Sequence, residues 1–222
     1  GALGHIGSSL LRHMSKNKKV KFIYLIDNMS SNRYCSLFNL PKHTLYKFLN
    51  IDLKKISIDQ IPKADFVIHL AAKTDAAQSK EYKNEFYTNN LAATKKIINY
   101  CLKTKAKLIF ASSTSVYGPQ SNLVDEYCDA SELKPQSPYA DIKLIEEKLI
   151  QKRLKNKNFY ILRLGTIYGF SPGIRFHTAV NKFIFQSSQD LPLTVWKTAF
   201  NQKRPYLSLS DFNRAINHII NN

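Results

Sequence analysis

The chain has 222 residues, 44% of them apolar, and its 33 basic and 16 acidic residues give a formal net charge of +17. This composition can bury a core and excludes a disordered chain, and the length fits one full domain plus part of another. The apolar runs are too short to cross a bilayer, so we expect no membrane partner. Three cysteines without a CxxC pair indicate a reducing, cytoplasmic location, and six histidines without ligand spacing argue against a metal site.

The positive charge would suit an anionic partner, either a nucleic acid or a small phosphorylated ligand. Lys and Asn are abundant along the whole chain, however, including helix faces where they solvate the surface. We therefore expect no nucleic acid as the main partner, and a non-catalytic nucleotide- or RNA-binding scaffold is only a remote alternative.

Apolar, strand-like segments alternate with amphipathic, helix-like segments through most of the chain. The predicted strands cover residues 21–27, 46–52, 65–70, 107–112 and 159–164, and the predicted helices cover 8–14, 86–103 and 139–154. Near-continuous apolar strands between helices are typical of a parallel sheet covered on both faces. We therefore predict an α/β fold with a Rossmann-type, doubly wound parallel sheet, and we assign residues 1–168 to an NAD-binding domain.

Beyond residue 168 the segments become shorter and are interrupted by proline and glycine, with helices expected near residues 177–189 and 210–220. We interpret residues 169–222 as a smaller substrate-binding region that is only partly present. Because the chain begins at Gly1 within a phosphate-binding turn, we also expect the first strand of the NAD-binding domain to be missing.

The first residues form a GxxGxxG turn, in which Gly1, Gly4 and Gly7 would let the backbone approach a pyrophosphate at the start of a helix. Asp27 lies 20 residues after Gly7, at the end of the next predicted strand. A carboxylate there can accept hydrogen bonds from the adenosine ribose and select NAD over NADP, although it could equally cap a local turn. Arg33 is close enough to leave NADP open. We predict NAD as the cofactor.

Further cofactor contacts are expected where the later strands end, because ligands bind at the carboxyl ends of parallel strands. Small residues after the third predicted strand would let a dinucleotide lie across the strand ends. The additional predicted cofactor-binding residues are Asn28, Asp52, Leu53, Leu70, Ala71 and Ala72.

Two segments contain the catalytic candidates. Ser113 follows a predicted strand, and Tyr139 and Lys143 form a YxxxK pair at the start of a predicted helix. Residues four apart lie on one helix face, so the phenol and the ammonium point into the same cleft. A free phenol is a poor base at neutral pH, but a neighbouring ammonium favours the phenolate. Lys143 can also hold the nicotinamide ribose, and Ser113 can bind the reacting oxygen.

In order, these motifs read GALGHIG, IDNMSSN, NID, HLAA, NNLAAT, FASSTSVYG, PQSPYADIK, LRLGTIYG and QKRPYLSLSD. Together they resemble the extended short-chain dehydrogenase/reductases of the NAD-dependent epimerase/dehydratase family, which act on sugar nucleotides. The resemblance implies that Ser113, Tyr139 and Lys143 are catalytic and that Asn90 supports the cofactor side of the active site. It also implies that Arg204 binds the diphosphate of a nucleotide-diphosphate sugar. We further expect a homodimer.

The sequence departs from the family pattern at two places that matter for the reaction. Family dehydratases have a carboxylate shortly after the catalytic Ser or Thr, where this chain has Thr114 and Ser115. Elimination of water needs an additional acid and base, so this difference argues against 4,6-dehydration. Thr166 replaces an Asn that many relatives use for the substrate phosphate. Thr114, Thr166 and Arg204 are the predicted substrate-binding residues.

The leading hypothesis is C4 epimerisation of a UDP-type hexose through a 4-keto intermediate. Tyr139 would take the proton of the 4-hydroxyl group while NAD takes the hydride, which then returns on the other face of the sugar. The alternative is an NAD(P)-dependent reductase or dehydrogenase of a sugar nucleotide, which would release its cofactor in every turnover.

Overall fold

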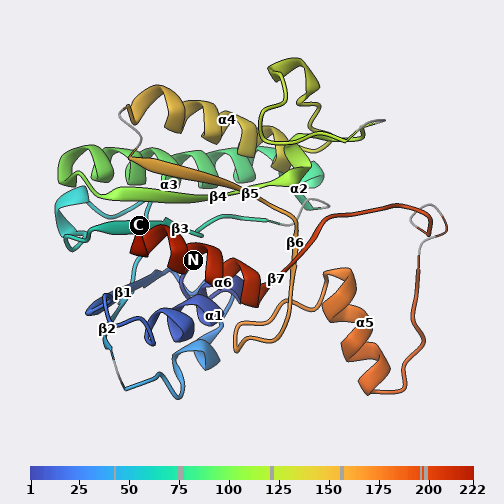
Figure 1. Ribbon diagram of the computed structural model, residues 1–222, viewed down its shortest axis with the longest axis horizontal. Coiled ribbons are helices and arrows are strands. Elements are labelled where there is room, and N and C mark those ends of the chain that lie inside the picture. The colour runs from blue at the N-terminus through green and yellow to red at the C-terminus, as the bar shows by residue number, and fades with distance from the viewer. Residues whose placement is uncertain (43, 75–77, 121–122, 156–157, 196, 198–199) are drawn as a thin grey trace. The chain divides into compact units, whose positions relative to one another are not determined.

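The computed structural model describes residues 1–42, 44–74, 78–120, 123–155, 158–195, 197 and 200–222 (Figure 1). The chain divides into two compact units: unit 1 comprises Gly1 and residues 51–164, and unit 2 comprises residues 2–50 and 165–222. Each unit combines parallel strands with helices, which confirms the predicted Rossmann-like α/β class.

Unit 1 is built on the parallel strands β3 (Phe66–His69), β4 (Lys107–Ser113) and β5 (Phe159–Leu164), which pair in that order. Helix α3 (Lys83–Thr104) connects β3 to β4, and α4 (Pro138–Arg153) lies between β4 and β5 in the chain. Both helices lie along the same side of this sheet and contact each other (Figure 1). Because the strands are parallel, the carboxyl ends of all three lie at the same edge of the sheet.

The core of unit 1 centres on β4, where Leu108, Ile109 and Phe110 are at most 1% exposed. Three consecutive buried residues agree with the continuous apolar sequence of this strand. Ile142 and Ile150 of α4 are fully buried as well. Short elements complete the unit: η2 (Ile58–Gln60), α2 (Gln78–Glu81), η3 (Thr114–Val116) and η4 (Ala130–Glu132).

In unit 2, β1 (Phe22–Asp27) and β2 (Leu45–Asn50) pair in parallel, with Asp27 opposite Asn50. Helix α1 (His5–Met14) packs against α6 (Leu209–Asn221), and apolar side chains of both helices are buried. The other elements are η1 (Tyr34–Leu37), β6 (Thr166–Tyr168), α5 (Ala179–Ser188) and β7 (Tyr206–Ser208). The strands β6 and β7 form a separate parallel pair.

Three local expectations differ from the structure. The first helix begins at His5, so Gly7 lies within its first turn instead of before the helix. Strand β2 ends at Asn50, and the prediction that Asp52 ends it was wrong, because the Asp52 carboxylate accepts a hydrogen bond from the Lys54 amide (2.9 Å) and starts a turn. The sequence also gave no sign of β6 and β7, which are only three residues long.

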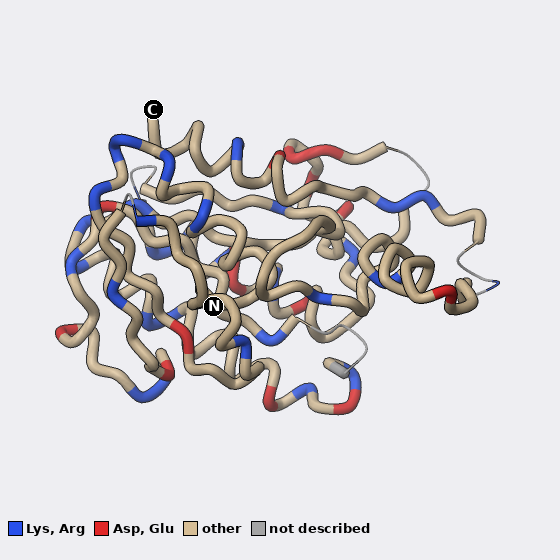
Figure 2. The backbone as a smooth tube through the Cα atoms, turned by 90° about the horizontal axis from the view of Figure 1, so that it is seen from below, with Lys and Arg blue, Asp and Glu red and all other residues tan. Residues whose placement is uncertain are grey.

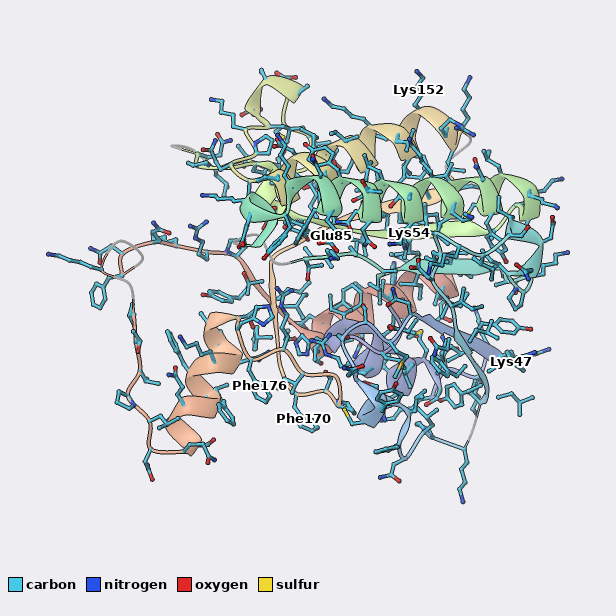
Figure 3. All side chains as sticks on the ribbon, turned by 180° about the vertical axis from the view of Figure 1, so that it is seen from behind. Lys47, Lys54, Glu85, Lys152, Phe170 and Phe176 are labelled. Carbon is cyan, nitrogen blue, oxygen red and sulfur yellow. The ribbon has the colours of Figure 1, made fainter. Side chains whose placement is uncertain are left out.

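Basic positions are scattered along the backbone, with fewer acidic positions between them (Figure 2). Lys152, for example, points outward from the last turns of α4 into solvent (Figure 3). This distribution agrees with a solvating role for most lysines. Among the residues that the structure describes, no helix is both long and apolar enough to span a membrane.

Candidate active site

The glycine turn of unit 2 is packed against the segment that follows β6. Gly4 precedes α1 and makes no side-chain cap, and the amides at the start of a helix are a favourable place for an anion. The Gly173 amide donates to Ser8 Oγ (3.0 Å), and a Cβ at Gly173 would lie 2.4 Å from the Leu3 carbonyl oxygen. His5 Nδ1 lies 3.0 Å from Ser171 Oγ. Burial, together with Arg33 and Arg175, lowers the pKa of His5 to about 4, so this imidazole is neutral.

Asp27 ends β1 and is only 8% exposed. Its carboxylate accepts hydrogen bonds from the backbone amides of Leu3 (3.1 Å) and Met29 (2.9 Å). The side chain therefore joins the glycine turn to the turn after β1, which is the local capping role considered above. Asn28, next to it, is exposed and accepts a hydrogen bond from the Ser30 amide.

In unit 1, Gly1 closely approaches the end of β3. A Cβ at Gly1 would lie 2.4 Å from the backbone carbon and oxygen of Leu70, so a larger residue would not fit. Ala71 and Ala72 follow, half-buried. Asn90 is fully buried, and its side chain binds both the amide (2.9 Å) and the carbonyl (3.0 Å) of Lys73. Asn90 thus fixes the backbone of Lys73, which follows Ala72.

Ser113 is the last residue of β4 and caps η3. Its Oγ accepts hydrogen bonds from both the amide (3.2 Å) and the hydroxyl (2.9 Å) of Ser115. Because both bonds are accepted, the Ser113 proton remains available for donation to another oxygen. Thr114 Oγ1 instead donates to the Leu164 carbonyl (3.3 Å), which ties η3 to the end of β5.

Tyr139 and Lys143 lie in the first two turns of α4, as predicted. Ser137 caps this helix by accepting a hydrogen bond from the Ala140 amide (3.2 Å), and Pro138 follows in the first turn, a favoured position for proline. The Tyr139 amide donates to Ser79 Oγ (3.3 Å). Helix α4 contacts η3, the turn that Ser113 caps, so unit 1 brings together the two segments that contain the catalytic candidates.

Lys143 differs from most lysines of the chain because it is buried, with 3% exposure. Its Nζ lies 3.1 Å from Glu146 Oε2 and 4.4 Å from the centroid of the Phe110 ring. Glu146 Oε1 in turn accepts a hydrogen bond from Thr94. Sequence reasoning did not identify Glu146 or Thr94, although the three-residue spacing between Lys143 and Glu146 on one helix could have indicated the ion pair.

A second buried carboxylate, Glu147, stabilises the strands behind the candidate site. It accepts two hydrogen bonds from Arg163 Nε (3.2 Å each), one from Arg163 Nη2 (2.8 Å) and another from the Ser112 hydroxyl. The hydrogen bonds to Glu147 raise the pKa of Arg163, so the guanidinium is charged. It also lies 4.9 Å from the Tyr117 ring centroid. This cluster fixes Ser112, the neighbour of Ser113, and sequence reasoning missed it as well.

The predicted substrate residues Thr166 and Arg204 lie near each other in unit 2. The Thr166 amide at the start of β6 donates to the Pro205 carbonyl (2.9 Å), and Arg204 immediately precedes Pro205. Arg204 is exposed and donates to Gln202 (2.6 Å). A Cβ at Gly165 would lie 2.7 Å from the Pro205 oxygen, which explains why this position in RLGTIYG is glycine.

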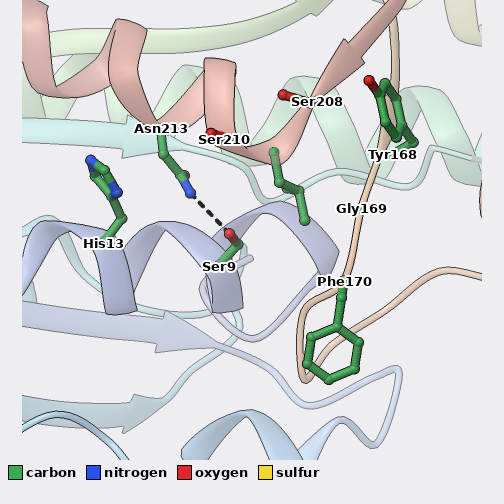
Figure 4. A pocket seen from close by; sticks show the side chains of 9 residues that line it. Ser9, His13, Tyr168, Gly169, Phe170, Ser208, Ser210 and Asn213 are labelled. Atoms are coloured by element: carbon green, nitrogen blue, oxygen red, sulfur yellow. Dashed lines mark hydrogen bonds between the residues drawn. The ribbon is translucent and has the colours of Figure 1, made fainter.

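Unit 2 also contains a shallow pocket of about 370 Å³ beside α1 and α6 (Figure 4). None of the predicted site residues lines it. Its lining residues are Ser9, His13, Tyr168, Gly169, Phe170, Ser208, Leu209, Ser210 and Asn213. The Asn213 amide donates to Ser9 Oγ (2.9 Å) across one side of the pocket (Figure 4).

Fold and sequence together define the class of protein. The profile of the NAD dependent epimerase/dehydratase family matches residues 1–222, and the chain belongs to this family. The resemblance inferred from the motifs is therefore confirmed.

Two curated relatives match nearly the whole chain. The chain is 29% identical to the uncharacterized UDP-glucose epimerase YtcB of Bacillus subtilis, covering 99% of this chain and 71% of that protein. It is 30% identical to the dTDP-D-glucose 4,6-dehydratase of Dictyostelium discoideum, covering 99% of this chain but only 54% of that protein. The chain thus spans about half the length of some curated relatives.

Solved structures of two 4-epimerases are similar to this chain in fold and sequence. The UDP-glucuronic acid 4-epimerase of Bacillus cereus, crystallised with UDP-glucuronic acid and NAD, superimposes with a TM-score of 0.83 at 28% identity, covering 100% of this chain and 72% of that one. The UDP-N-acetylglucosamine 4-epimerase of Methanobrevibacter ruminantium gives a TM-score of 0.81 at 27% identity, covering 97% of this chain and 69% of that one.

Proposed function

We propose that the protein is a UDP-sugar 4-epimerase that works through a 4-keto intermediate with NAD as a bound cofactor. The observation that carries this proposal is that α4, whose first turns contain Tyr139 and Lys143, contacts η3, the turn that Ser113 caps at the end of β4. Both solved relatives described above are 4-epimerases of UDP-sugars, which supports the choice of reaction.

The residues present fit a dinucleotide. In unit 2, the start of α1 after Gly4 would bind the phosphates, and Asp27 and Asn28 would bind the adenosine ribose. In unit 1, the small residues near the end of β3 would leave space for the cofactor, and Asn90 would support them. The remaining proposed cofactor residues are Gly1, Gly7, Asp52, Leu53, Leu70, Ala71, Ala72, Tyr139 and Lys143. Bound NAD would supply a hydride acceptor that later returns the hydride.

The chain's own residues would handle the proton and the substrate. Tyr139 would take the proton of the sugar 4-hydroxyl group and give it back after the sugar turns over. Ser113 would donate its hydroxyl proton to the same oxygen, and Lys143 would hold the nicotinamide ribose. Arg204 and Thr166 would bind the diphosphate. A homodimer in the cytoplasm completes the proposal.

A dehydratase is the competing enzyme class, because one relative of 30% identity has that activity. Against it, Thr114 and Ser115 have only hydroxyl groups, and both are engaged with Leu164 and Ser113. Asp125 and Glu126 are exposed, as expected for solvated loop charges.

Incubation of the full-length protein with UDP-glucose, UDP-N-acetylglucosamine and UDP-glucuronic acid tests the proposal. We expect at least one C4 epimer, with no net formation of NADH. Stoichiometric NADH release would favour the reductase or dehydrogenase alternative instead.

A further inference from the structure

Lys143 is held by a chain of buried polar side chains that crosses unit 1 from β3 through α3 to α4. His69 ends β3, Thr94 lies on α3, and Glu146 lies one turn after Lys143 on α4. All four side chains belong to residues that are at most 5% exposed. Polar groups buried to this degree destabilise a protein unless they are paired. We therefore consider which of these groups donates a hydrogen bond to which.

The direction of each hydrogen bond follows from the protons available. Thr94 donates its single proton to Glu146 Oε1, so its oxygen must accept from His69 Nε2, 3.0 Å away. Burial, reinforced by Lys143, lowers the pKa of His69 to about 3, so the ring is neutral and carries its one proton on Nε2. The network thus fixes Glu146 Oε1 from the side away from Lys143.

The other carboxylate oxygen faces the lysine. Glu146 Oε2 has no hydrogen-bond partner among the described residues, and the Lys143 ammonium lies 3.1 Å from it. Isolated, either charge would be costly at this depth, because a buried ion without its partner tends to lose its charge. The ammonium also has the Phe110 ring 4.4 Å from its nitrogen, a contact that favours a cation.

We infer that Glu146 is a positioning residue for Lys143: its carboxylate, 3.1 Å from Nζ, balances the charge of the buried lysine and holds its side chain in place. An ammonium has three N–H donors, so Lys143 can donate to the hydroxyl groups of the nicotinamide ribose while it lies beside Glu146. This inference rests on the proposed function, in which Lys143 binds that ribose. It adds a residue outside the YxxxK pair on which the cofactor affinity depends.

The test measures NAD affinity by titration of nucleotide-free, full-length protein, together with kcat and KM for the UDP-sugar. In Glu146→Gln, which keeps the shape but removes the charge, we expect NAD affinity to fall roughly tenfold or more, the size seen when an orienting partner is lost at other sites. We expect kcat to fall while KM for the sugar changes little, since Glu146 acts on the cofactor side. Glu146→Asp, which keeps the charge, should recover part of the NAD affinity and part of kcat.

Two further variants keep the inference testable if Glu146→Gln does not fold. Thr94→Val removes the hydrogen bond to Glu146 Oε1 without leaving a charge unpaired, and it should weaken NAD binding in the same direction. The double variant Lys143→Met/Glu146→Gln removes both charges, so its thermal stability should exceed that of Glu146→Gln while NAD affinity stays low. Asp59→Asn removes an exposed ion pair with Lys103 and serves as the control, with unchanged affinity.

The measurements on these variants distinguish the positioning role of Glu146 from the proposed function. If Lys143→Met weakens NAD binding and turnover but Glu146→Gln and Thr94→Val do not, the inference is wrong and the proposed function stands. If Lys143→Met leaves both unchanged, the proposed function itself is wrong.

Discussion

Replacement of Glu147 by Gln should destabilise the protein strongly, because it removes a buried carboxylate from a half-buried guanidinium. Glu147 is 2% exposed and receives three hydrogen-bond contacts from Arg163, whose side chain is 19% exposed. Gln has the same shape, so no cavity forms, but its amide N–H₂ group would face a donor. Removal of one partner of a buried ion pair costs about 3–5 kcal/mol.

That free energy corresponds to a fall in Tm of about 6–20 °C, since proteins of this size lose about 2–4 °C per kcal/mol. Thermal unfolding followed by circular dichroism measures it. The matched control is Asp59→Asn, whose ion pair with Lys103 has side chains 69% and 60% exposed. An exposed pair contributes only about 0–1 kcal/mol, so this control should shift Tm by no more than about 4 °C.

Turnover provides a second measurement on the same variant. Glu147 also accepts the Ser112 hydroxyl, and Ser112 immediately precedes Ser113, so kcat of the folded variant should fall as well. A Glu147→Gln protein with a Tm within about 2 °C of the wild type would refute the reasoning, because it would mean that the buried pair contributes no more than a surface pair does.

Three other predictions follow from the site. Tyr139→Phe should lower turnover by about 10²–10⁴-fold while NAD binding, measured by titration, stays nearly intact, and near-normal activity would overturn the catalytic assignment. Asp27 should make the protein prefer NAD over NADP in a fluorescence titration, whereas equal or tighter NADP binding would mean that Arg33 governs the ribose end. No 4-keto-6-deoxy product should form from UDP-, dTDP- or GDP-hexoses; mass spectrometry showing loss of one water would place the missing acid and base elsewhere in the protein.

Much of the fold could be predicted from the sequence because long periodic segments determine it. β5 was predicted with its observed bounds, and β1 and α4 to within one residue at each end, since apolar runs and the Ser-Pro start of α4 are strong local signals. β6 and β7 were missed because three-residue strands have no periodicity to detect. Asp52 was misplaced because its side chain forms a turn that competes with strand propagation.

The candidate site was predictable only in part. Motif spacing identified Ser113, Tyr139 and Lys143, because their chemistry depends on positions along two local segments. The residues behind them were not identified, since Glu146 and Glu147 read as surface charges on a lysine-rich helix. Their burial depends on α3 and β5, which come from distant parts of the chain, so only the tertiary structure reveals their partners.

The most direct test of the central claim follows the hydrogen at C4 of the sugar. The full-length protein is incubated in D₂O with the UDP-sugar that it converts, and the C4 epimer is examined by proton NMR and mass spectrometry. Epimerisation through a 4-keto intermediate predicts that the product keeps its original hydrogen at C4, because this hydrogen leaves and returns as a hydride. Incorporation of deuterium at C4, or the absence of any C4 epimer, would contradict the account.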